Sequence, residues 1–205
     1  MIQILSPEEI AYKEHEAVLE VPTVLRDASL ETYRTDNQIQ VKAKTAVEGF
    51  ICDTTVKLKH RTLVLCGPPG TAKTFLAVSV FRVLAPLLVD RKNTGEVTTH
   101  KNYFWTRADK LKNHLTGFKT EEERFFKNHL YSAAFAVIDD IDKYPSGQWA
   151  AELYGLIDNR LCNYPSINVI TMNSTRAEFI EKYREYGAPI MSRLERNGAI
   201  FVKTC

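Results

Sequence analysis

Short apolar runs alternate with longer amphipathic stretches from Thr62 to the end of the chain. Strands that are buried on both faces are continuous apolar runs, whereas covering helices carry apolar residues every three or four positions. The alternation therefore predicts an α/β fold in which a parallel sheet is covered by helices on both faces. The expected strands are 62–66, 97–105, 133–138, 168–172 and 199–202, and the expected helices are 73–84, 107–115, 121–130, 148–161 and 177–186.

A less regular lead-in precedes this alternating region. Residues 7–19 are compatible with a helix, but its apolar stripe is thin. Pro22 breaks any helix there because its ring fixes φ and disfavours helical backbone at the preceding residue. A second helix is expected at about residues 39–56. We therefore expect a short helical appendage over residues 1–20 and one folded core over residues 21–205.

A glycine-bearing loop joins the first strand of the core to a helix that begins at Lys73. The loop and the first helical residues are Gly67, Pro68, Pro69, Gly70, Thr71, Ala72, Lys73, Thr74 and Phe75. A loop in this context binds phosphate, because its backbone N–H groups and the positive end of the helix surround the anion. We expect Lys73 to reach the β- and γ-phosphates of ATP and the Thr74 hydroxyl to ligate Mg²⁺.

Ala72 departs from the usual pattern of this loop, which has glycine before the lysine. If φ is positive at this position, alanine costs about 1–2 kcal/mol. The alternative is a Gly/Pro turn that precedes lysine and threonine by chance. The strand and the helix on either side disfavour that alternative, so the sequence predicts an ATP site despite the substitution.

Two adjacent carboxylates, Asp139 and Asp140, end the expected strand 133–138. Ligand sites of α/β proteins lie at the carboxyl ends of the strands. We therefore expect Asp139 to hold Mg²⁺, through water, and Asp140 to polarise the attacking water as a general base. The alternative is that both carboxylates cap the following turn, and the phosphate loop upstream favours the metal site.

Two polar residues further along the chain are candidates for reading the γ-phosphate. Asn173 ends the strand 168–172, where its amide either orients the lytic water or forms a turn. Arg193 is a candidate to act from a neighbouring subunit on the charge that develops on the transferring phosphoryl group. An ordinary surface ion pair is the alternative for Arg193, and Arg196 and Arg160 are further candidates for the same role.

These motifs together resemble those of AAA+ ATPases of the DnaC/DnaI helicase-loader and IstB transposition-helper group. The similarity extends to segments 21–30, 104–111 and 149–160, and so covers about residues 21–202. The resemblance implies an AAA+ P-loop NTPase core with a five-stranded parallel sheet sandwiched by helices. It also implies that Asn173 is the sensor-1 residue, that Arg193 is the arginine finger, and that the protein assembles as a self-oligomer on DNA.

The sequence differs from this group at both ends. The part before Val21 is shorter than the N-terminal domain by which such loaders grip the replicative helicase. Little sequence follows the last expected strand, so the helical lid and its sensor-2 arginine are expected to be absent or truncated.

Composition and charge add few constraints. With 44% hydrophobic and 25% charged residues, the 205-residue chain has the composition of a globular protein. No apolar run approaches the roughly 20 residues that a membrane-spanning helix needs, so we expect a cytoplasmic protein without a membrane partner. The four scattered cysteines form no CxxC pair and are expected to be reduced thiols.

A net charge of +2 is too small to indicate a nucleic-acid binder, so any DNA contact must come from a local patch. The candidate patch combines the aromatic segment 101–105 with Arg107, Lys110 and Lys112, as single-stranded DNA binders combine stacking rings with positive charge. The alternative is a core strand beside a solvated helix face.

Four functions remain open at this stage. The first is an ATPase that loads a replicative helicase or assists DNA replication, and the second is a transposition helper that acts with a transposase. The third is a small P-loop kinase, which the asparagine-ended strand and the lack of an arginine-rich lid disfavour. The fourth is an adaptor that binds ATP, hydrolyses it weakly and works through protein contacts.

Overall fold

The computed structural model describes most of the core of the chain. The described residues are 21–57, 61–87, 89–91, 97–101, 103–116, 120–145, 147–162 and 166–205. The appendage and the helix expected within residues 1–20 lie outside them. Within these ranges, no helix combines the length and the apolar character that crossing a bilayer requires.

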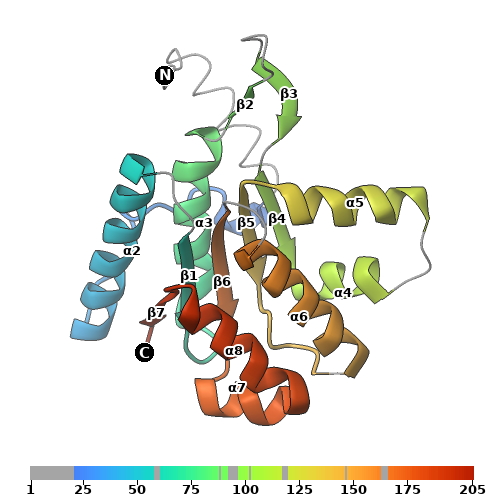
Figure 1. Cartoon of the computed structure of the whole chain (residues 1–205). Coiled ribbons are helices and arrows are strands. Elements are labelled where there is room, and N and C mark those ends of the chain that lie inside the picture. Colours follow the sequence, from blue (N-terminus) through green and yellow to red (C-terminus); the bar gives the residue numbers. More distant parts are fainter. Residues whose placement is uncertain are drawn as a thin grey trace.

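A five-stranded parallel sheet forms the centre of the molecule (Figure 1). Its strands are β1 (Arg61–Cys66), β4 (Tyr103–Arg107), β5 (Phe135–Asp139), β6 (Ile167–Met172) and β7 (Ile200–Lys203). They lie in the order β4-β5-β6-β1-β7, and every neighbouring pair is parallel. The predicted α/β class is confirmed. All five carboxyl ends therefore lie at one edge of the sheet.

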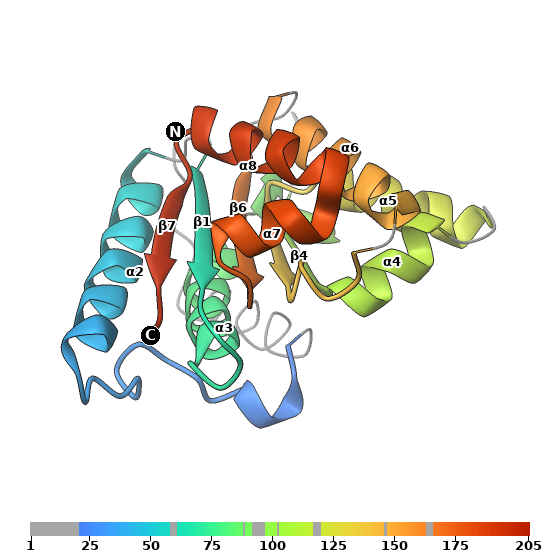
Figure 2. The same cartoon turned by 90° about the horizontal axis from the view of Figure 1, so that it is seen from below.

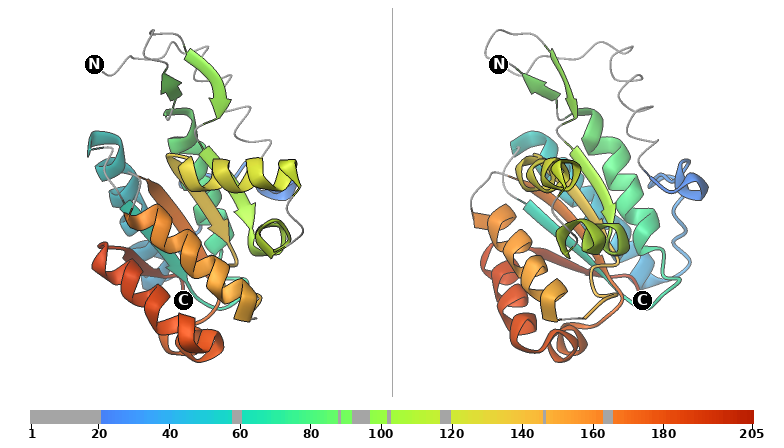
Figure 3. Two further views of the ribbon diagram at one scale, coloured as in Figure 1. Left: turned by 45° about the vertical axis from the view of Figure 1, so that its right-hand side comes forward. Right: turned by 90° about the vertical axis from the view of Figure 1, so that its right-hand side faces the viewer.

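Helices cover both faces of the sheet, as Figures 2 and 3 show from other directions. One face carries α2 (Gln38–Lys57) and α3 (Lys73–Leu84), and the other carries α4 (Ala108–Thr116), α5 (Glu121–Ser132), α6 (Gly147–Cys162), α7 (Arg176–Tyr183) and α8 (Gly187–Arg196). In β1, Leu63 and Leu65 pack in the first layer and Val64 packs in the second. Burial on both sides explains why the strands are continuous apolar runs.

The lead-in to the core packs against the layer of α2 and α3. Val21 and Ala28 are buried there, on either side of the short 3₁₀ helix η1 (Thr23–Leu25). The Arg82 guanidinium of α3 donates a hydrogen bond of 2.9 Å to the Ala28 carbonyl. Val21 and Ala28 therefore pack with the core, and the division between an appendage and a core at residue 21 stays a prediction.

The expected strand 97–105 was wrong as a single element. The structure divides it into β3 (Val97–Lys101), which pairs antiparallel with β2 (Val89–Arg91) in a separate small sheet, and β4, which begins at Tyr103. Both pieces favour extended backbone, so propensity predicts the extended conformation but not the strand with which each piece pairs.

The chain after β6 also differs from the expectation. The expected helix 177–186 is α7 followed by a 3₁₀ turn, η3 (Arg184–Tyr186), because Arg184 leaves the helical region with φ 49° and ψ −120°. Helix α8 was not predicted from the sequence, since Gly187 and Pro189 stand at its start. Proline is tolerated there because the first N–H groups of a helix have no intrahelical partner.

Two smaller expectations are confirmed. Helix α3 ends at Leu84, directly before the 3₁₀ turn η2 (Ala85–Leu87) that contains Pro86. All four cysteines are free thiols.

Candidate functional site

The phosphate loop lies between the end of β1 and the start of α3. Two of its residues have left-handed backbone, namely Gly70 with φ 82° and Ala72 with φ 61°. A side chain is disfavoured in this conformation because Cβ crowds the following carbonyl oxygen. The substitution at Ala72 therefore keeps the backbone geometry for which glycine is usual, at a cost of about 1–2 kcal/mol.

Lys73 is the first residue of α3, and its side chain contacts the phosphate loop. Only 5% of the residue is exposed, and its ammonium donates a hydrogen bond of 2.8 Å to the Pro68 carbonyl. Burial lowers the pKa of Lys73, and the nearby carboxylates of Asp140, Asp142 and Asp139 oppose that shift. The lysine is thus held by a neutral carbonyl at the loop where a phosphate would bind.

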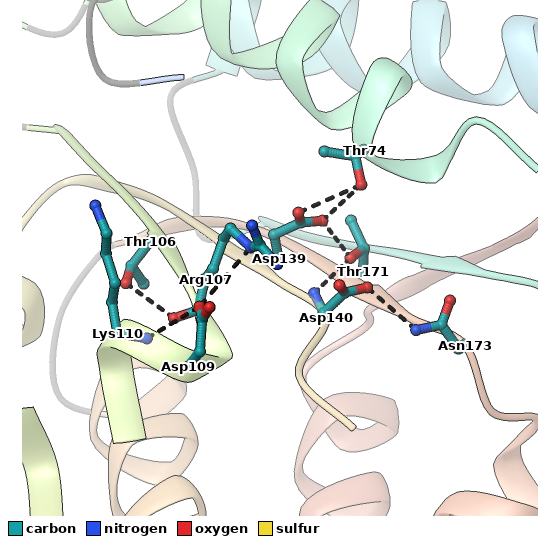
Figure 4. A network of polar contacts seen from close by, with 9 residues as sticks. All are labelled: Thr74, Thr106, Arg107, Asp109, Lys110, Asp139, Asp140, Thr171 and Asn173. Carbon is teal, nitrogen blue, oxygen red and sulfur yellow. Dashed lines mark hydrogen bonds and ion pairs between the residues drawn. The ribbon is translucent and has the colours of Figure 1, made fainter. Parts of the chain in front are cut away.

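Asp139, at the end of β5, lies beside Thr74 although 65 positions separate them (Figure 4). The Thr74 hydroxyl donates to the two carboxylate oxygens at 3.0 and 3.3 Å. The Thr171 hydroxyl of β6 donates to one of these oxygens at 2.6 Å. Burial raises the pKa of Asp139, and these two hydrogen bonds oppose the increase.

The surroundings of Asp139 fit a divalent cation. The residue is only 3% exposed, and no cationic side chain in the described part of the chain forms an ion pair with it. A hydroxyl and a carboxylate are the hard oxygen ligands that Mg²⁺ prefers. Arg107, opposite Asp139 on β4, is a positive charge that acts on this carboxylate, and a cation held by Thr74 and Asp139 would add a second in direct contact.

Asp140 points toward Asn173. The Asn173 amide donates a hydrogen bond of 3.1 Å to the Asp140 carboxylate (Figure 4). The backbone N–H of Asp140 donates to the Thr171 hydroxyl at 2.8 Å, and its φ is 57°. Asp139, Asp140 and Asn173 therefore form one connected group at the carboxyl edge of the sheet.

Sequence reasoning missed two residues that hold this group together. Thr171 accepts from Asp140 and donates to Asp139, so its single hydroxyl positions both carboxyl residues. Asp142 is buried and accepts hydrogen bonds from the backbone N–H groups of Asn173, at 3.0 Å, and Ser174, at 2.6 Å. The only sequence signal for Asp142 is its position two residues after the acidic pair.

Arg193 does not join this group within one chain. It lies on α8, where its guanidinium is 2.7 Å from the Asp158 carboxylate of α6 and 3.5 Å from the Tyr154 hydroxyl. It is partly exposed, and its role across a subunit contact stays a prediction. Arg160 is wrong as an alternative, because it is buried and donates to the Leu130 carbonyl and the Asn168 amide oxygen.

The candidate DNA patch is also corrected in part. Tyr103 and Trp105 are buried in the core beside Phe81, so they present no ring for a nucleotide base. Lys110 is exposed on α4, and Lys112 is half-buried on the same helix. Arg107 is half-buried and lies 3.8 Å from the Asp109 carboxylate, so Lys110 and Lys112 are what is left of the basic part of the patch.

The family model for the AAA domain (dynein-related subfamily) matches residues 62–182. The chain belongs to this AAA family. The matched part of this AAA protein contains the phosphate loop, the acidic pair and Asn173. No curated protein sequence matches the chain.

Several solved structures share the fold of this AAA protein. The crystal structure of the DnaC helicase loader has a TM-score of 0.68 and 19% identity, and the match covers 89% of this chain and 99% of that chain. The crystal structure of DnaI has a TM-score of 0.67 and 17% identity, and the match covers 90% of this chain and 92% of that chain. A putative primosome component from Streptococcus pyogenes serotype M3 has a TM-score of 0.66 and 16% identity, and the match covers 91% of this chain and 94% of that chain. The AAA+ fold of the DnaC and DnaI ATPases, expected from the motifs, is confirmed.

Proposed function

We propose that this AAA protein binds ATP with Mg²⁺ and hydrolyses it. The observation that carries the proposal is the convergence of Lys73, Thr74, Asp139, Asp140 and Asn173, which come from three separate segments of the sequence, at one edge of the sheet. Family membership supports nucleotide hydrolysis in general.

The residues divide the chemistry among them. Lys73 exchanges the Pro68 carbonyl for the β- and γ-phosphates, and the loop N–H groups surround the same oxygens. Thr74 and Asp139 hold Mg²⁺, which when bound neutralises charge that develops on the phosphates. Asp140 accepts a proton from the attacking water, and Asn173 keeps the Asp140 carboxylate in place.

The proposal predicts that Lys73→Ala abolishes tight ATP binding and leaves the fold intact. The lost ammonium contacts phosphate, and among the described residues its hydrogen bond is to the Pro68 carbonyl. Isothermal titration with ATP and Mg²⁺ measures the affinity, and circular dichroism checks the fold. Lys42→Ala, at an exposed position of α2, is the matched control. A folded Lys73→Ala protein with wild-type affinity would show that the loop does not bind the nucleotide.

We further propose that the protein acts on DNA in replication, as a loader of a replicative helicase or an accessory ATPase. Its fold is that of the DnaC helicase loader. Basic and aromatic groups support contact with single-stranded DNA, because Lys112 and Lys143 have their ammonium groups 4.9 and 5.7 Å from the centre of the Tyr144 ring.

A partner experiment separates the replication role from a role in transposition. The protein, tagged and loaded with ATP or ADP, is used to recover partners from its native host. We expect ATP-dependent recovery of a replicative helicase. Recovery of a transposase instead would identify a transposition helper.

A further inference from the structure

The residue after β7 contacts the phosphate loop. β7 pairs parallel with β1 so that Lys203 lies opposite Cys66, the last residue before the loop. Figure 2 shows the ends of these two strands side by side. The backbone N–H and the hydroxyl of Thr204 both donate to the Cys66 carbonyl, at 2.9 and 3.1 Å. Thr204 is thus fixed to the first turn of the loop.

The Thr204 hydroxyl also contacts the hydroxyl of Thr71, which lies in the phosphate loop. Thr204 Oγ1 lies 2.7 Å from Thr71 Oγ1, and Thr204 is only 3% exposed. Thr71 Oγ1 in turn lies 2.8 Å from the Pro68 carbonyl oxygen, which is the same oxygen that accepts from Lys73 at 2.8 Å. Two hydroxyls therefore connect the end of β7 to the acceptor that holds the lysine.

Gly67 shows how closely these hydroxyls approach the backbone. A Cβ atom on Gly67 would lie 2.5 Å from Thr204 Oγ1 and 3.0 Å from Thr71 Oγ1. The first distance is too short for a carbon and an oxygen atom and the second is tight, so a side chain at Gly67 would displace the Thr204 hydroxyl. The two threonines therefore pack directly on the first residue of the loop.

Each hydroxyl has one proton, so two arrangements place a proton between the two threonines. In one, Thr204 donates to Cys66 and Thr71 donates to Thr204, while Lys73 satisfies the Pro68 carbonyl. In the other, Thr204 donates to Thr71 and Thr71 donates to Pro68. The second arrangement keeps the Pro68 carbonyl hydrogen-bonded after Lys73 has moved to a phosphate.

We propose that Thr204 is a positioning residue of the nucleotide site, which holds Thr71 and the Pro68 carbonyl while Lys73 exchanges between that carbonyl and a phosphate. The proposal rests on the proposed function, since it takes Lys73 to bind ATP. Thr204 lies outside the three sequence motifs of the site, which are the phosphate loop, the acidic pair and the strand end at Asn173.

The test compares two substitutions of Thr204 that differ in the hydroxyl. Thr204→Val keeps the shape and removes the hydroxyl, and we expect the Kd for ATP to increase about tenfold, which corresponds to about 1.4 kcal/mol. Thr204→Ser keeps the hydroxyl, and its Kd for ATP should stay within about twofold of the wild-type value, because the contacts to Cys66 and Thr71 are made by that hydroxyl. Thr54→Val, which removes a buried hydroxyl from α2 far along the chain, should leave the Kd unchanged.

A double-mutant cycle separates a positioning role from a general loss of packing. Thr71→Val, Thr204→Val and the double variant are titrated with ATP, and the melting temperature is recorded for each. If the two hydroxyls act as one unit, the double variant loses no more affinity than the worse single variant. Should Thr204→Val not fold, Thr71→Val alone must still weaken ATP binding about tenfold.

Three results would overturn the inference. They are a wild-type Kd for folded Thr204→Val, equal losses in Thr204→Val and Thr204→Ser, and additive losses in the cycle. Each is distinguishable from failure of the proposed function, because Lys73→Ala then still abolishes ATP binding. If Lys73→Ala binds ATP normally, the ATP site itself is wrong and the positioning role is lost with it.

Discussion

Thr171 shows how much one small side chain does in this site. Its β-branched side chain suits a buried strand, and its hydroxyl both donates to Asp139 and accepts from the backbone of Asp140. Valine would fit the same strand but would leave a buried carboxylate without its shortest hydrogen bond. Such a residue satisfies the fold and the chemistry together.

The left-handed backbone at Ala72 predicts an unusual response to glycine. Ala72→Gly should increase the free energy of unfolding by up to about 1 kcal/mol, because relief of strain exceeds the added freedom of the unfolded chain. Chemical denaturation measures the change. Ala177→Gly, on the exposed face of α7, should instead lower stability by about 0.5–1 kcal/mol. Loss of stability in both variants would contradict strain at Ala72.

Asp140 is expected to act on hydrolysis rather than on binding. Asp140→Asn should keep nucleotide affinity and slow turnover about 10²-fold or more, since the amide cannot accept a proton from water. The rate is measured at saturating ATP, with the exposed Asp27→Asn as control. Wild-type turnover in Asp140→Asn would show that another group activates the water.

The sequence predicted those site residues that stand in contiguous motifs. The loop from Gly67 to Thr74, the acidic pair and Asn173 each follow a strand, and parallel strands bring their carboxyl ends together. Thr171 and Thr204 were not predicted, because a threonine in or after an apolar strand is ordinary in the sequence. Only the pairing of β1 with β6 and β7 gives these hydroxyls their partners.

Elements with clear ends were predicted well. Helix α3 was predicted with its exact bounds, since the phosphate loop precedes it and Pro86 follows it. The small sheet of β2 and β3 was not predicted, because pairing between short strands leaves little trace in residue type. Helix α8 was missed for the opposite reason: its first turn contains residues that usually interrupt helices.

Helix α4 and the turn after β5 together form the proposed contact with single-stranded DNA. Tyr144→Ala should weaken binding about tenfold or more, because base stacking on an aromatic ring is worth roughly 1–3 kcal/mol per base. Fluorescence anisotropy of a labelled oligothymidylate at fixed salt measures the affinity. Tyr131→Ala is the matched control. The Tyr131 ring also has a lysine beside it, but that residue, Lys127, already forms an ion pair of 3.0 Å with Glu152. Equal losses of DNA affinity in Tyr144→Ala and Tyr131→Ala would contradict a specific DNA contact at Tyr144.

At the scale of the molecule, the proposed oligomer makes Arg193 a residue of the neighbouring site. Arg193→Ala and Lys73→Ala subunits should each be inactive, and their mixture should regain part of the ATPase activity, because some contacts then pair an intact loop with an intact arginine. An engaged arginine of this kind is worth roughly 10³–10⁵ in rate. The assay needs single-stranded DNA and a protein concentration at which the subunits assemble.

Two outcomes would count against Arg193. Failure of mixed oligomers to regain activity would leave Arg196 as the candidate, since Arg160 is buried. Wild-type ATPase activity of assembled Arg193→Ala would show that Arg193 has a structural role, through its ion pair with Asp158, and not a catalytic one.

The contact between Cys66 and Thr204 joins residues that are 138 positions apart, and this separation matters while the protein is being made. At about 5–20 residues per second, translation adds β7 roughly 7–28 s after β1. Until then β1 lacks its neighbour β7 and exposes an unpaired edge that favours aggregation. We therefore expect a nascent chain to acquire affinity for ATP only after β7 has been made, and chaperones that shield strand edges to matter most before that point.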